Sequence, residues 1–291
     1  MSFAHLLPPS WKTQVTEWLQ EDTPSFDYGG FVVGEVERTA YLLGKGKQTA
    51  VLAGVPFVDE IFKQLDCRVE WHMKEGDTFN PVKRVATVTG KARFLLLGER
   101  VALNLLARCS GIATKSRRFR DIARANGYKG IIAGTRKTTP GFRLVEKYGM
   151  IVGGIDAHRH DLSSMIMLKD NHIWSCGSIT NAIKTARAAG GFSLLMDVEV
   201  RTEQEADEAI EAGADVVMLD NMEGEELLQV ARRLRERWSG RRFLLETSGG
   251  IDENNLCERA VNEIDILSTS AVHQSVQHID FSLKIQKSEA S

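Results

Sequence analysis

Cysteine is scarce in this chain, and its scarcity excludes several kinds of site. The 291 residues include four cysteines, Cys67, Cys109, Cys176 and Cys257, which lie far apart and form no Cys-x-x-Cys pair. We therefore expect neither a disulfide framework nor a cysteine-based zinc site. The pattern suits a reducing compartment, so we expect a cytoplasmic protein, with the nucleus as the alternative.

Long apolar runs and an excess of one charge are also missing. The first 20 residues contain no apolar core of a signal peptide, and no uncharged run approaches the length of a membrane span. We therefore expect no membrane partner. With 37 basic and 39 acidic residues the formal net charge is -2, so no overall field favours a nucleic-acid partner. Any recognition of an anion must be local.

Length and composition are those of an ordinary globular protein. Hydrophobic residues make up 43% of the sequence and charged residues 26%, so long disordered stretches are not expected. A chain of 291 residues can form two modest domains or one barrel with an added part.

The first part of the chain, from Val51 to about Ser110, mixes helical and strand patterns. Apolar residues recur at helical spacing between Val55 and Leu65. They then alternate with polar residues between Cys67 and Met73, as in a half-buried strand. A long helical stretch follows Gly90. This region is typical of an α+β domain.

From about Ile112 the pattern becomes a repeated unit of helix, short apolar strand and polar strand end. Strand ends recur roughly every 20 to 30 residues, which is the spacing of βα units. We therefore expect a parallel sheet closed into a barrel, with the chemistry at the carboxyl ends of its strands. An open doubly wound sheet is the alternative, although no Gly-x-Gly-x-x-Gly turn follows a first strand.

The most informative feature is a cluster of basic residues at predicted strand ends. Three motifs carry it, Gly134–Gly141 (GTRKTTPG), His158–Asp161 (HRHD) and Lys169–His172 (KDNH). Two of these motifs directly follow short apolar runs, as the ends of buried strands do. Arginine offers a planar fork of donors and lysine a mobile charge, so the cluster suits carboxylates and phosphates. A salt-bridged surface is the alternative.

The later strand ends are acidic and then small and hydroxyl-bearing. Glu199 and Asp220 end two successive strands, where carboxylates can hold Mg²⁺ or stabilise positive charge. A structural salt bridge would also explain Glu199. Thr247–Gly250 and Ser268–Ser270 can cradle a phosphate, and a plain turn is the other interpretation of the Ser-Gly-Gly segment. Together the strand ends favour group transfer from an activated phosphate compound.

At this point the chain resembles the type II phosphoribosyltransferases, and closely resembles the quinolinate phosphoribosyltransferase family. The resemblance extends from Gly30 to Leu283. It is carried by Gly134–Gly141, His158-Arg159, Met167–His172, Met218–Asn221 and Ser248–Gly250.

The resemblance implies an α/β protein with an N-terminal α/β sandwich domain and an incomplete, seven-stranded α/β barrel. Residues 1–112 would form the first domain, to which residues 276–291 return, and residues 113–275 the barrel. The implied reaction joins quinolinate to phosphoribosyl pyrophosphate with Mg²⁺ as cofactor. Its products are nicotinate mononucleotide, pyrophosphate and carbon dioxide. The family also implies a homodimer or an oligomer of dimers.

Residue roles follow from the same resemblance. The quinolinate carboxylates would be bound by Arg136, His158, Arg159, Lys169 and, across the dimer interface, Arg100. Lys137 and Lys169 would face the pyrophosphate, and Glu199 and Asp220 the ribose hydroxyls and Mg²⁺. The 5′-phosphate would be bound by Ser248, Gly249, Gly250, Ser268 and Ser270. Many relatives carry glycine at the position of Ser270, which puts a backbone contact there in question.

Two other functions compete with this interpretation. A nicotinate phosphoribosyltransferase would bind one carboxylate and release no carbon dioxide, and the number of basic residues suits a dicarboxylate better. A non-catalytic anion-binding barrel would be expected to lack a lysine or a carboxylate from the strand ends. None of the residues named above is missing.

Overall fold

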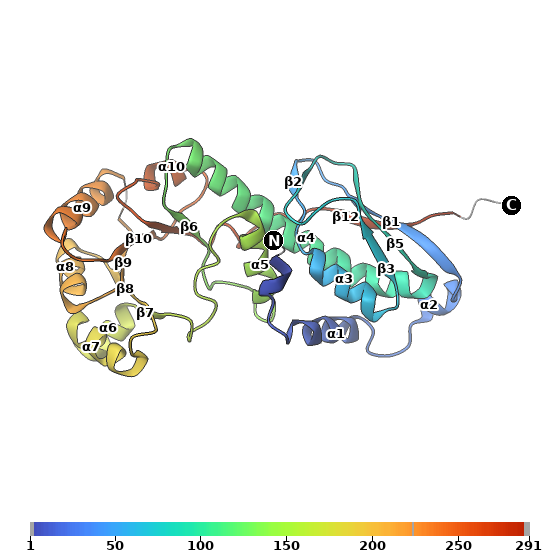
Figure 1. The fold of residues 1–291 in the computed structure, drawn as a ribbon, viewed down its shortest axis with the longest axis horizontal. Helices are drawn as coiled ribbons and strands as arrows, with labels where there is room; N and C mark the ends of the chain where they lie inside the picture. The colour runs from blue at the N-terminus through green and yellow to red at the C-terminus, as the bar shows by residue number, and fades with distance from the viewer. Residues whose placement is uncertain (1–2, 223, 288–291) are drawn as a thin grey trace. The chain divides into compact units, whose positions relative to one another are not determined.

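The computed structural model describes residues 3–222 and 224–287, which form two compact units (Figure 1). The first unit comprises the described residues up to Arg117, Thr139–Gly154 and those from Ser275 onward. The second comprises Arg118–Thr138 and the described residues of 155–274. Helix α5 (Arg143–Gly153) belongs to the first unit by its contacts, although it lies inside the sequence range expected for the barrel.

The first unit contains a four-stranded antiparallel sheet in the order β12-β1-β5-β3. Its strands are β12 (Phe281–Ile285), β1 (Glu37–Gly44), β5 (Lys83–Lys91) and β3 (Arg68–Trp71). The last strand in the chain pairs with the first, with Leu283 opposite Leu42. A separate pair is formed by β2 (Ala50–Val51) and β4 (Thr78–Phe79).

Helices α1 (Trp11–Asp22), α3 (Val55–Gln64) and α5 of the first unit pack apolar residues into one core. The unit also contains the 3-10 helix η1 (Phe3–Leu6) and α2 (Tyr28–Val33), whose large apolar side chains are exposed. In α3 the fully buried residues Phe57, Val58, Ile61 and Phe62 recur at helical spacing, as the sequence predicted. The ring of Phe57 meets that of Trp11 edge to face, with centroids 5.6 Å apart, so α1 and α3 share this core.

The predicted long helix is α4 (Ala92–Ala125), which begins in the first unit and ends in the second. Gly111 lies in its interior, where glycine costs about 1 kcal/mol relative to alanine. A Cβ atom there would lie 2.5 Å from the carbonyl oxygen of Gln277. The glycine therefore allows the returning C-terminal segment to pass close to the helix.

The second unit is built on a parallel sheet in the order β6-β11-β10-β9-β8-β7. Its strands are β6 (Ile131–Ala133), β7 (Ile166–Leu168), β8 (Met196–Val200), β9 (Val216–Asp220), β10 (Leu244–Ser248) and β11 (Ile266–Ser268). An isolated parallel bridge joins Asp156 to Ala133. The sheet thus has six strands and one bridge where seven strands were expected. Within the described ranges no pairing joins β7 to β6, so the barrel is incomplete.

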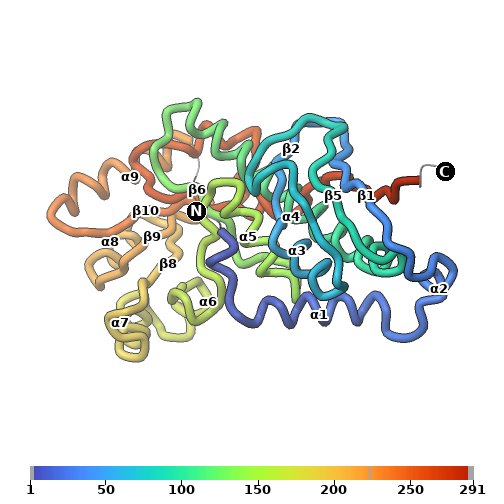
Figure 2. Tube along the Cα trace, turned by 45° about the vertical axis from the view of Figure 1, so that its right-hand side comes forward, coloured from blue at the N-terminus to red at the C-terminus, as the bar shows by residue number. Residues whose placement is uncertain are grey.

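Helices of this unit follow strands β7 to β10 along the chain (Figure 2). They are α6 (Asp170–Cys176), α7 (Ile179–Gly190), α8 (Glu203–Ala212), α9 (Gly224–Arg237) and α10 (Leu256–Arg259). Two begin at side-chain caps, since Ser178 accepts from the Asn181 amide and Thr202 from the Glu205 amide.

The strands present different residues to their two faces. Met196, Val198 and Val200 of β8 pack in the core that the helices cover. Successive side chains of a strand point to opposite faces, so Asp197 and Glu199 lie on the other side of β8. The face away from the helices therefore carries polar groups.

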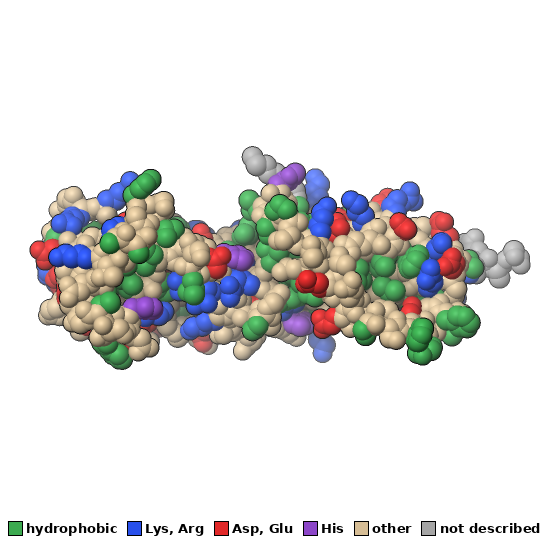
Figure 3. Space-filling model, turned by 90° about the horizontal axis from the view of Figure 1, so that it is seen from below, with side chains coloured by type: hydrophobic (Ala, Val, Ile, Leu, Met, Phe, Trp, Pro, Cys, Tyr) green, Lys and Arg blue, Asp and Glu red, His purple; other side chains and the backbone are tan. Residues whose placement is uncertain are grey.

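The surface agrees with the balanced composition. On the face drawn in Figure 3, basic and acidic side chains are interspersed. Among the described residues, no helix combines the length and apolar character that crossing a membrane requires.

Candidate active site

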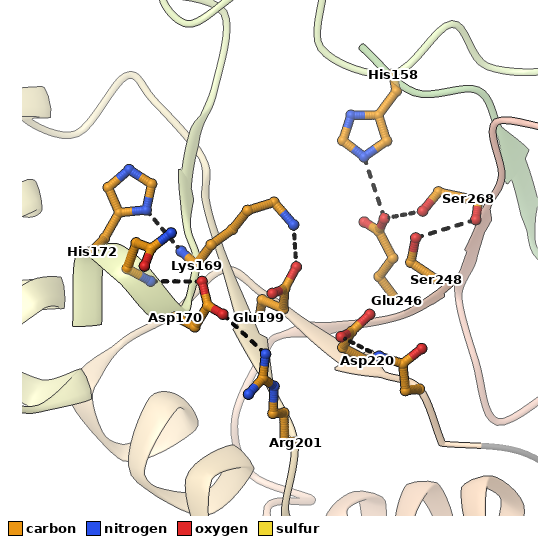
Figure 4. A network of polar contacts seen from close by, with 12 residues as sticks. His158, Lys169, Asp170, His172, Glu199, Arg201, Asp220, Glu246, Ser248 and Ser268 are labelled. Atoms are coloured by element: carbon orange, nitrogen blue, oxygen red, sulfur yellow. Dashed lines mark hydrogen bonds and ion pairs between the residues drawn. The ribbon is translucent and has the colours of Figure 1, made fainter. Parts of the chain in front are cut away.

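The carboxyl ends of the parallel strands bring most of the predicted site residues to one edge of the second unit. All six strands run in the same direction, so their last residues lie along the same edge. The residues gathered there include Lys169, Glu199, Asp220, Ser248 and Ser268 (Figure 4). The structure thus brings together the cation, carboxylates and hydroxyls that the sequence placed on separate strand ends.

The backbone of Lys169 is held at the start of α6. Its amide donates to Nδ1 of His172 at 3.0 Å, and its ammonium group forms an ion pair with Glu199. The Glu199 side chain is 10% exposed, whereas that of Lys169 is 43% exposed. The mobile lysine can therefore turn toward an anion and leave the Glu199 carboxylate to meet positive charge.

Asp220 and Asn221 form the neighbouring part of the edge. The Asn221 side-chain amide donates to Asp220 Oδ2 at 2.8 Å, and Asn221 itself has a positive φ of 57°. A Cβ atom on Gly249 would lie 2.8 Å from Asn221 Oδ1. Glycine at position 249 therefore lets the next loop approach the Asp220 carboxylate closely.

The Ser248–Gly250 segment turns sharply after β10. Gly249 and Gly250 have φ values of 90° and 62°, a conformation that favours glycine. The Ser248 hydroxyl donates to the carbonyl oxygen of Ser268 at 3.4 Å, so the ends of β10 and β11 are linked. Ser270 lies two residues further on and is half-buried.

The basic loop after β6 is the most exposed part of the site. Arg136 and Lys137 both have exposed side chains. The Thr135 hydroxyl accepts from the Lys137 amide at 3.1 Å and lies 3.0 Å from Nε2 of the buried His273. Thr135 thereby anchors the loop while the two cations extend into solvent.

Arg159 is the less exposed arginine of the site. Burial lowers the pKa of its guanidinium, the nearby Arg136 lowers it further, and Asp197 and Glu246 oppose the change. It also donates to the carbonyl oxygen of Met165 at 3.4 Å. The two nearby carboxylates therefore offset part of the repulsion between Arg159 and Arg136.

His158 is tied to the protein through both ring nitrogens. Its Nδ1 accepts the Arg159 amide at 2.7 Å, and its Nε2 lies 3.3 Å from Glu246 Oε1. Since Nδ1 is an acceptor, Nε2 carries the proton and donates to Glu246. The residue has a positive φ of 58°, and its amide donates to Asp156 at 2.6 Å. His158 therefore fixes the position of Arg159.

Two buried carboxylates escaped the sequence interpretation. Asp197 is 0% and Glu246 1% exposed, and the structure sets both near the predicted cations. Glu246 accepts from His158 and from the Ser268 hydroxyl. Neither oxygen of Asp197 has a hydrogen-bond partner in the described part of the chain. Burial, and then the charge of Glu246, raise the pKa of Asp197 well above its ordinary value.

These two residues did carry a signal. Each is an acidic residue that follows apolar residues of its strand, and Asp197 lies two residues before Glu199, on the same face of β8. Only residues at the predicted strand ends were expected in the site. Asp197 and Glu246 lie two residues before Glu199 and Ser248, so the prediction missed them.

One group of side chains lies close enough to hold a cation. A ligand atom from each of His158, Asp197 and Glu246 lies within 4.8 Å of the others. The proton on His158 Nε2 leaves no lone pair there for a metal, and Nδ1 is occupied by the Arg159 amide. Glu199 and Asp220 offer further carboxylate oxygens at the same edge, and Glu199 is already paired with Lys169.

Arg100 is the predicted site residue that lies elsewhere in the chain. It is an exposed residue of α4 within the first unit. The other predicted residues all belong to the second unit.

Comparison with known proteins identifies the family. Residues 28–110 match the family described as quinolinate phosphoribosyl transferase, N-terminal domain, and residues 112–284 match its C-terminal domain. The chain is 49% identical to the nicotinate-nucleotide pyrophosphorylase (carboxylating) of Dictyostelium discoideum, over 99% of this chain and 100% of that protein. It is 47% identical to the human protein of the same name, over 99% and 96% of the two chains.

A solved structure shows the same fold. The nicotinate-nucleotide pyrophosphorylase from Francisella tularensis is 31% identical and superimposes with a TM-score of 0.88. The match covers 98% of this chain and 100% of that chain. The chain therefore belongs to the quinolinate phosphoribosyltransferase family of enzymes.

Proposed function

We propose that the residues at this sheet edge perform the family's reaction, nicotinate-nucleotide pyrophosphorylase (carboxylating) activity in NAD biosynthesis. Phosphoribosyl pyrophosphate donates its phosphoribosyl group to quinolinate, and pyrophosphate and carbon dioxide leave. The observation that carries the proposal is one edge that combines the Lys169–Glu199 ion pair, Asp220 and the Ser248–Gly250 turn. Each of the substrate's charged parts then has a matching group.

Quinolinate has two adjacent carboxylates, and the basic residues form its clamp. Arg136 and Arg159 bind carboxylate oxygens through their guanidinium forks. Lys169 turns away from Glu199 to meet the same anion. His158 supports the clamp because its Nδ1 accepts a hydrogen bond from the Arg159 amide. Its Nε2 lies next to Glu246.

Glu199 and Asp220 would hold Mg²⁺ and the ribose hydroxyls. Mg²⁺, when bound, neutralises charge on the departing pyrophosphate. Lys137, exposed on its loop, faces that same leaving group. Ser248, Gly249, Gly250, Ser268 and Ser270 surround the 5′-phosphate through hydroxyls and amides.

The chemistry follows from these charges. As the bond from ribose C1 to pyrophosphate breaks, positive charge develops on the ribose, and the carboxylates of Glu199 and Asp220 stabilise it. The quinolinate nitrogen then bonds to C1 and becomes cationic. Carbon dioxide leaves from the ring carbon beside that nitrogen, because the cation stabilises the electron pair left behind. A proton then takes the place of the lost carboxylate.

The activity is tested by incubating the protein with quinolinate, phosphoribosyl pyrophosphate and Mg²⁺. Equal amounts of pyrophosphate and carbon dioxide are expected. Nicotinate offered in place of quinolinate should give little turnover. Turnover of nicotinate at a similar rate, without carbon dioxide, would overturn the assignment to a dicarboxylate.

Assembly is the second part of the proposal, and it rests on the family. The active form is a homodimer or an oligomer of dimers in which Arg100 of one subunit reaches the clamp of its partner. Mixing inactive Arg100→Ala chains with inactive Glu199→Ala chains should then restore activity after subunit exchange, because some hybrid sites contain both residues. Exchange without recovered activity would show that Arg100 acts within its own chain.

A further inference from the structure

Arg259 is a buried arginine that the reaction does not itself require. It lies at the end of α10 and is 2% exposed, the largest of the fully buried side chains. Burying a charged guanidinium is costly unless its donors are satisfied. The groups that accept its hydrogen bonds therefore show which part of the protein this arginine stabilises.

The guanidinium donates to main-chain carbonyl oxygens of two strand-end loops. Nη2 donates to Ser248 at 3.2 Å and to Gly249 at 2.8 Å, both in the turn after β10. Nη1 donates to Met222, two residues beyond Asp220 at the end of β9. One side chain thus joins the loop of the Asp220 carboxylate to the Ser248–Gly250 turn.

These contacts also set the direction of the amides in the turn. In a trans peptide the carbonyl and the N–H of the following residue point in opposite directions. Because Arg259 holds the carbonyls of Ser248 and Gly249, the amides of Gly249 and Gly250 point away from it. The next carbonyl, of Gly250, accepts from the Asn255 side chain at 2.9 Å, which directs the Ile251 amide in the same way. Within the described part of the chain, none of the three amides donates to another residue.

We propose that Arg259 is the positioning residue of the 5′-phosphate site, and that it couples this site to the Asp220 loop. It never touches the substrate. By holding the carbonyls of Ser248 and Gly249 inward it presents the amides of Gly249 and Gly250 outward, as part of an anion-binding concavity. This inference rests on the proposed function, since it assumes that the Ser248–Gly250 turn binds the phosphate.

The test uses ribose 5-phosphate, which carries the phosphate and the ribose but no pyrophosphate. Arg259→Lys keeps the charge but cannot reach three carbonyls with one ammonium group. Its affinity for ribose 5-phosphate, measured by calorimetry, should fall about 10- to 100-fold, the effect of losing one or two charge-assisted hydrogen bonds. Arg241→Lys is the matched control, because Arg241 also donates to main-chain carbonyls, those of Ile210 and Glu211. The control should bind like wild type.

Steady-state kinetics separate positioning from general damage. In Arg259→Lys the KM for phosphoribosyl pyrophosphate should rise, and more Mg²⁺ should be needed for half-maximal activity, because the Asp220 loop is released too. The KM for quinolinate should stay close to that of wild type. Unchanged ribose 5-phosphate affinity in a folded Arg259→Lys, or an equal rise of both KM values, would overturn the proposal.

Two further outcomes are distinguishable. If wild type does not bind ribose 5-phosphate, the assignment of the phosphate site itself is wrong and this inference falls with it. If Arg259→Lys does not fold, amide hydrogen exchange on wild type decides. Ribose 5-phosphate should then slow exchange at Gly249, Gly250 and Ile251, and unchanged exchange at these amides would refute their outward orientation.

Discussion

In the first unit, the half-buried Glu75 and the buried Glu146 have hydrogen bonds made within the protein, whereas in the second unit the buried Asp197 has none among the described residues. Glu75 accepts from the amides of Gly54 and Val55 at 2.7 and 2.9 Å and so caps helix α3. Glu146, fully buried, accepts from Arg108 and Thr139. Asp197 has no hydrogen-bond partner among the described residues.

This difference distinguishes carboxylates that stabilise the fold from carboxylates that are available to a ligand. A satisfied buried carboxylate stabilises the backbone that it binds, and its loss exposes unpaired donors. An unsatisfied one costs free energy of folding and is retained where a substrate or ion benefits from its charge. Substitutions in the two units should therefore change different measured quantities.

The largest effect should come from Lys169, in the second unit. Lys169→Met removes the charge that neutralises both substrate anions, so kcat/KM should fall about 10³-fold. Its melting temperature should stay close to that of wild type, because the side chain is nearly half exposed. Lys184→Met, an exposed lysine of α7, is the control and should remain fully active. A large fall in the melting temperature of Lys169→Met would contradict the expectation that this residue of the second unit affects activity and not stability.

The opposite behaviour is expected of Arg108 in the first unit. Arg108→Met leaves the Glu146 carboxylate buried and poorly compensated, which should lower the free energy of unfolding by about 3 to 4 kcal/mol. Lys91→Met, which breaks an exposed ion pair with Glu35, should cost less than about 1 kcal/mol. Denaturant titration measures both. Equal losses in the two variants would contradict a special role for the buried pair.

Arg159 should change affinity without changing stability. Arg159→Ala removes one fork of the clamp, and quinolinate binding should weaken by about 3 kcal/mol. Ribose 5-phosphate affinity should hardly change, because that ligand occupies the other side of the site. Calorimetry measures the affinity for each ligand. An equal loss of affinity for quinolinate and for ribose 5-phosphate would show that Arg159 is not part of the dicarboxylate clamp.

Glu75 predicts how the first unit responds to pH. Burial raises the pKa of Glu75 to about 7, against the opposing effect of its two amide donors. The folded state therefore favours the protonated acid, so this contribution to stability is complete below the unfolded pKa and is lost as the pH rises through about 7. Between about pH 5 and 8 the free energy of unfolding should fall by about 2 to 3 kcal/mol.

Glu75→Gln should remove that slope, since the amide side chain does not ionise in this range. Glu70→Gln changes an exposed glutamate of β3 and should keep it. An identical pH dependence in wild type and Glu75→Gln would assign the slope to other groups.

The smallest effect should come from Asp197. Asp197→Asn replaces a buried carboxyl group that has no hydrogen-bond partner in the described residues, so the free energy of unfolding should stay constant or rise by up to about 1 kcal/mol. Turnover should nevertheless fall about tenfold, because Arg159 and Lys169 lose a neighbouring carboxyl group whose ionised form they favour. A variant that is much less stable would show that Asp197 supports the fold.

The sequence predicted those parts of the structure that depend on local pattern. Buried parallel strands consist of short apolar runs, so β8 to β11 and their polar ends were identifiable, and the helical spacing in α3 and α4 was equally clear. The basic, acidic and hydroxyl-bearing strand ends lie at one edge as predicted, because parallel strands leave no other arrangement.

What the sequence did not predict depends on contacts between distant segments. The expected seventh strand is a single bridge at Asp156, because the chain there follows β6 for only one residue. Arg259 is near acidic residues in sequence but turns inward to carbonyls ten or more residues away. The tautomer of His158 follows from a hydrogen bond to the Arg159 amide, in a loop conformation with positive φ that no periodicity reveals.

The pairing of β12 with β1 means that the sheet of the first unit can be completed only late in synthesis. A ribosome releases β1, β3 and β5 early, then the whole second unit, and only afterwards the strand that covers the outer edge of β1. Throughout that interval the nascent chain carries an open sheet edge, which is the kind of surface that recruits other strands. A message cut short before Phe281 would leave that edge permanently uncovered, so a strand translated late protects one translated much earlier.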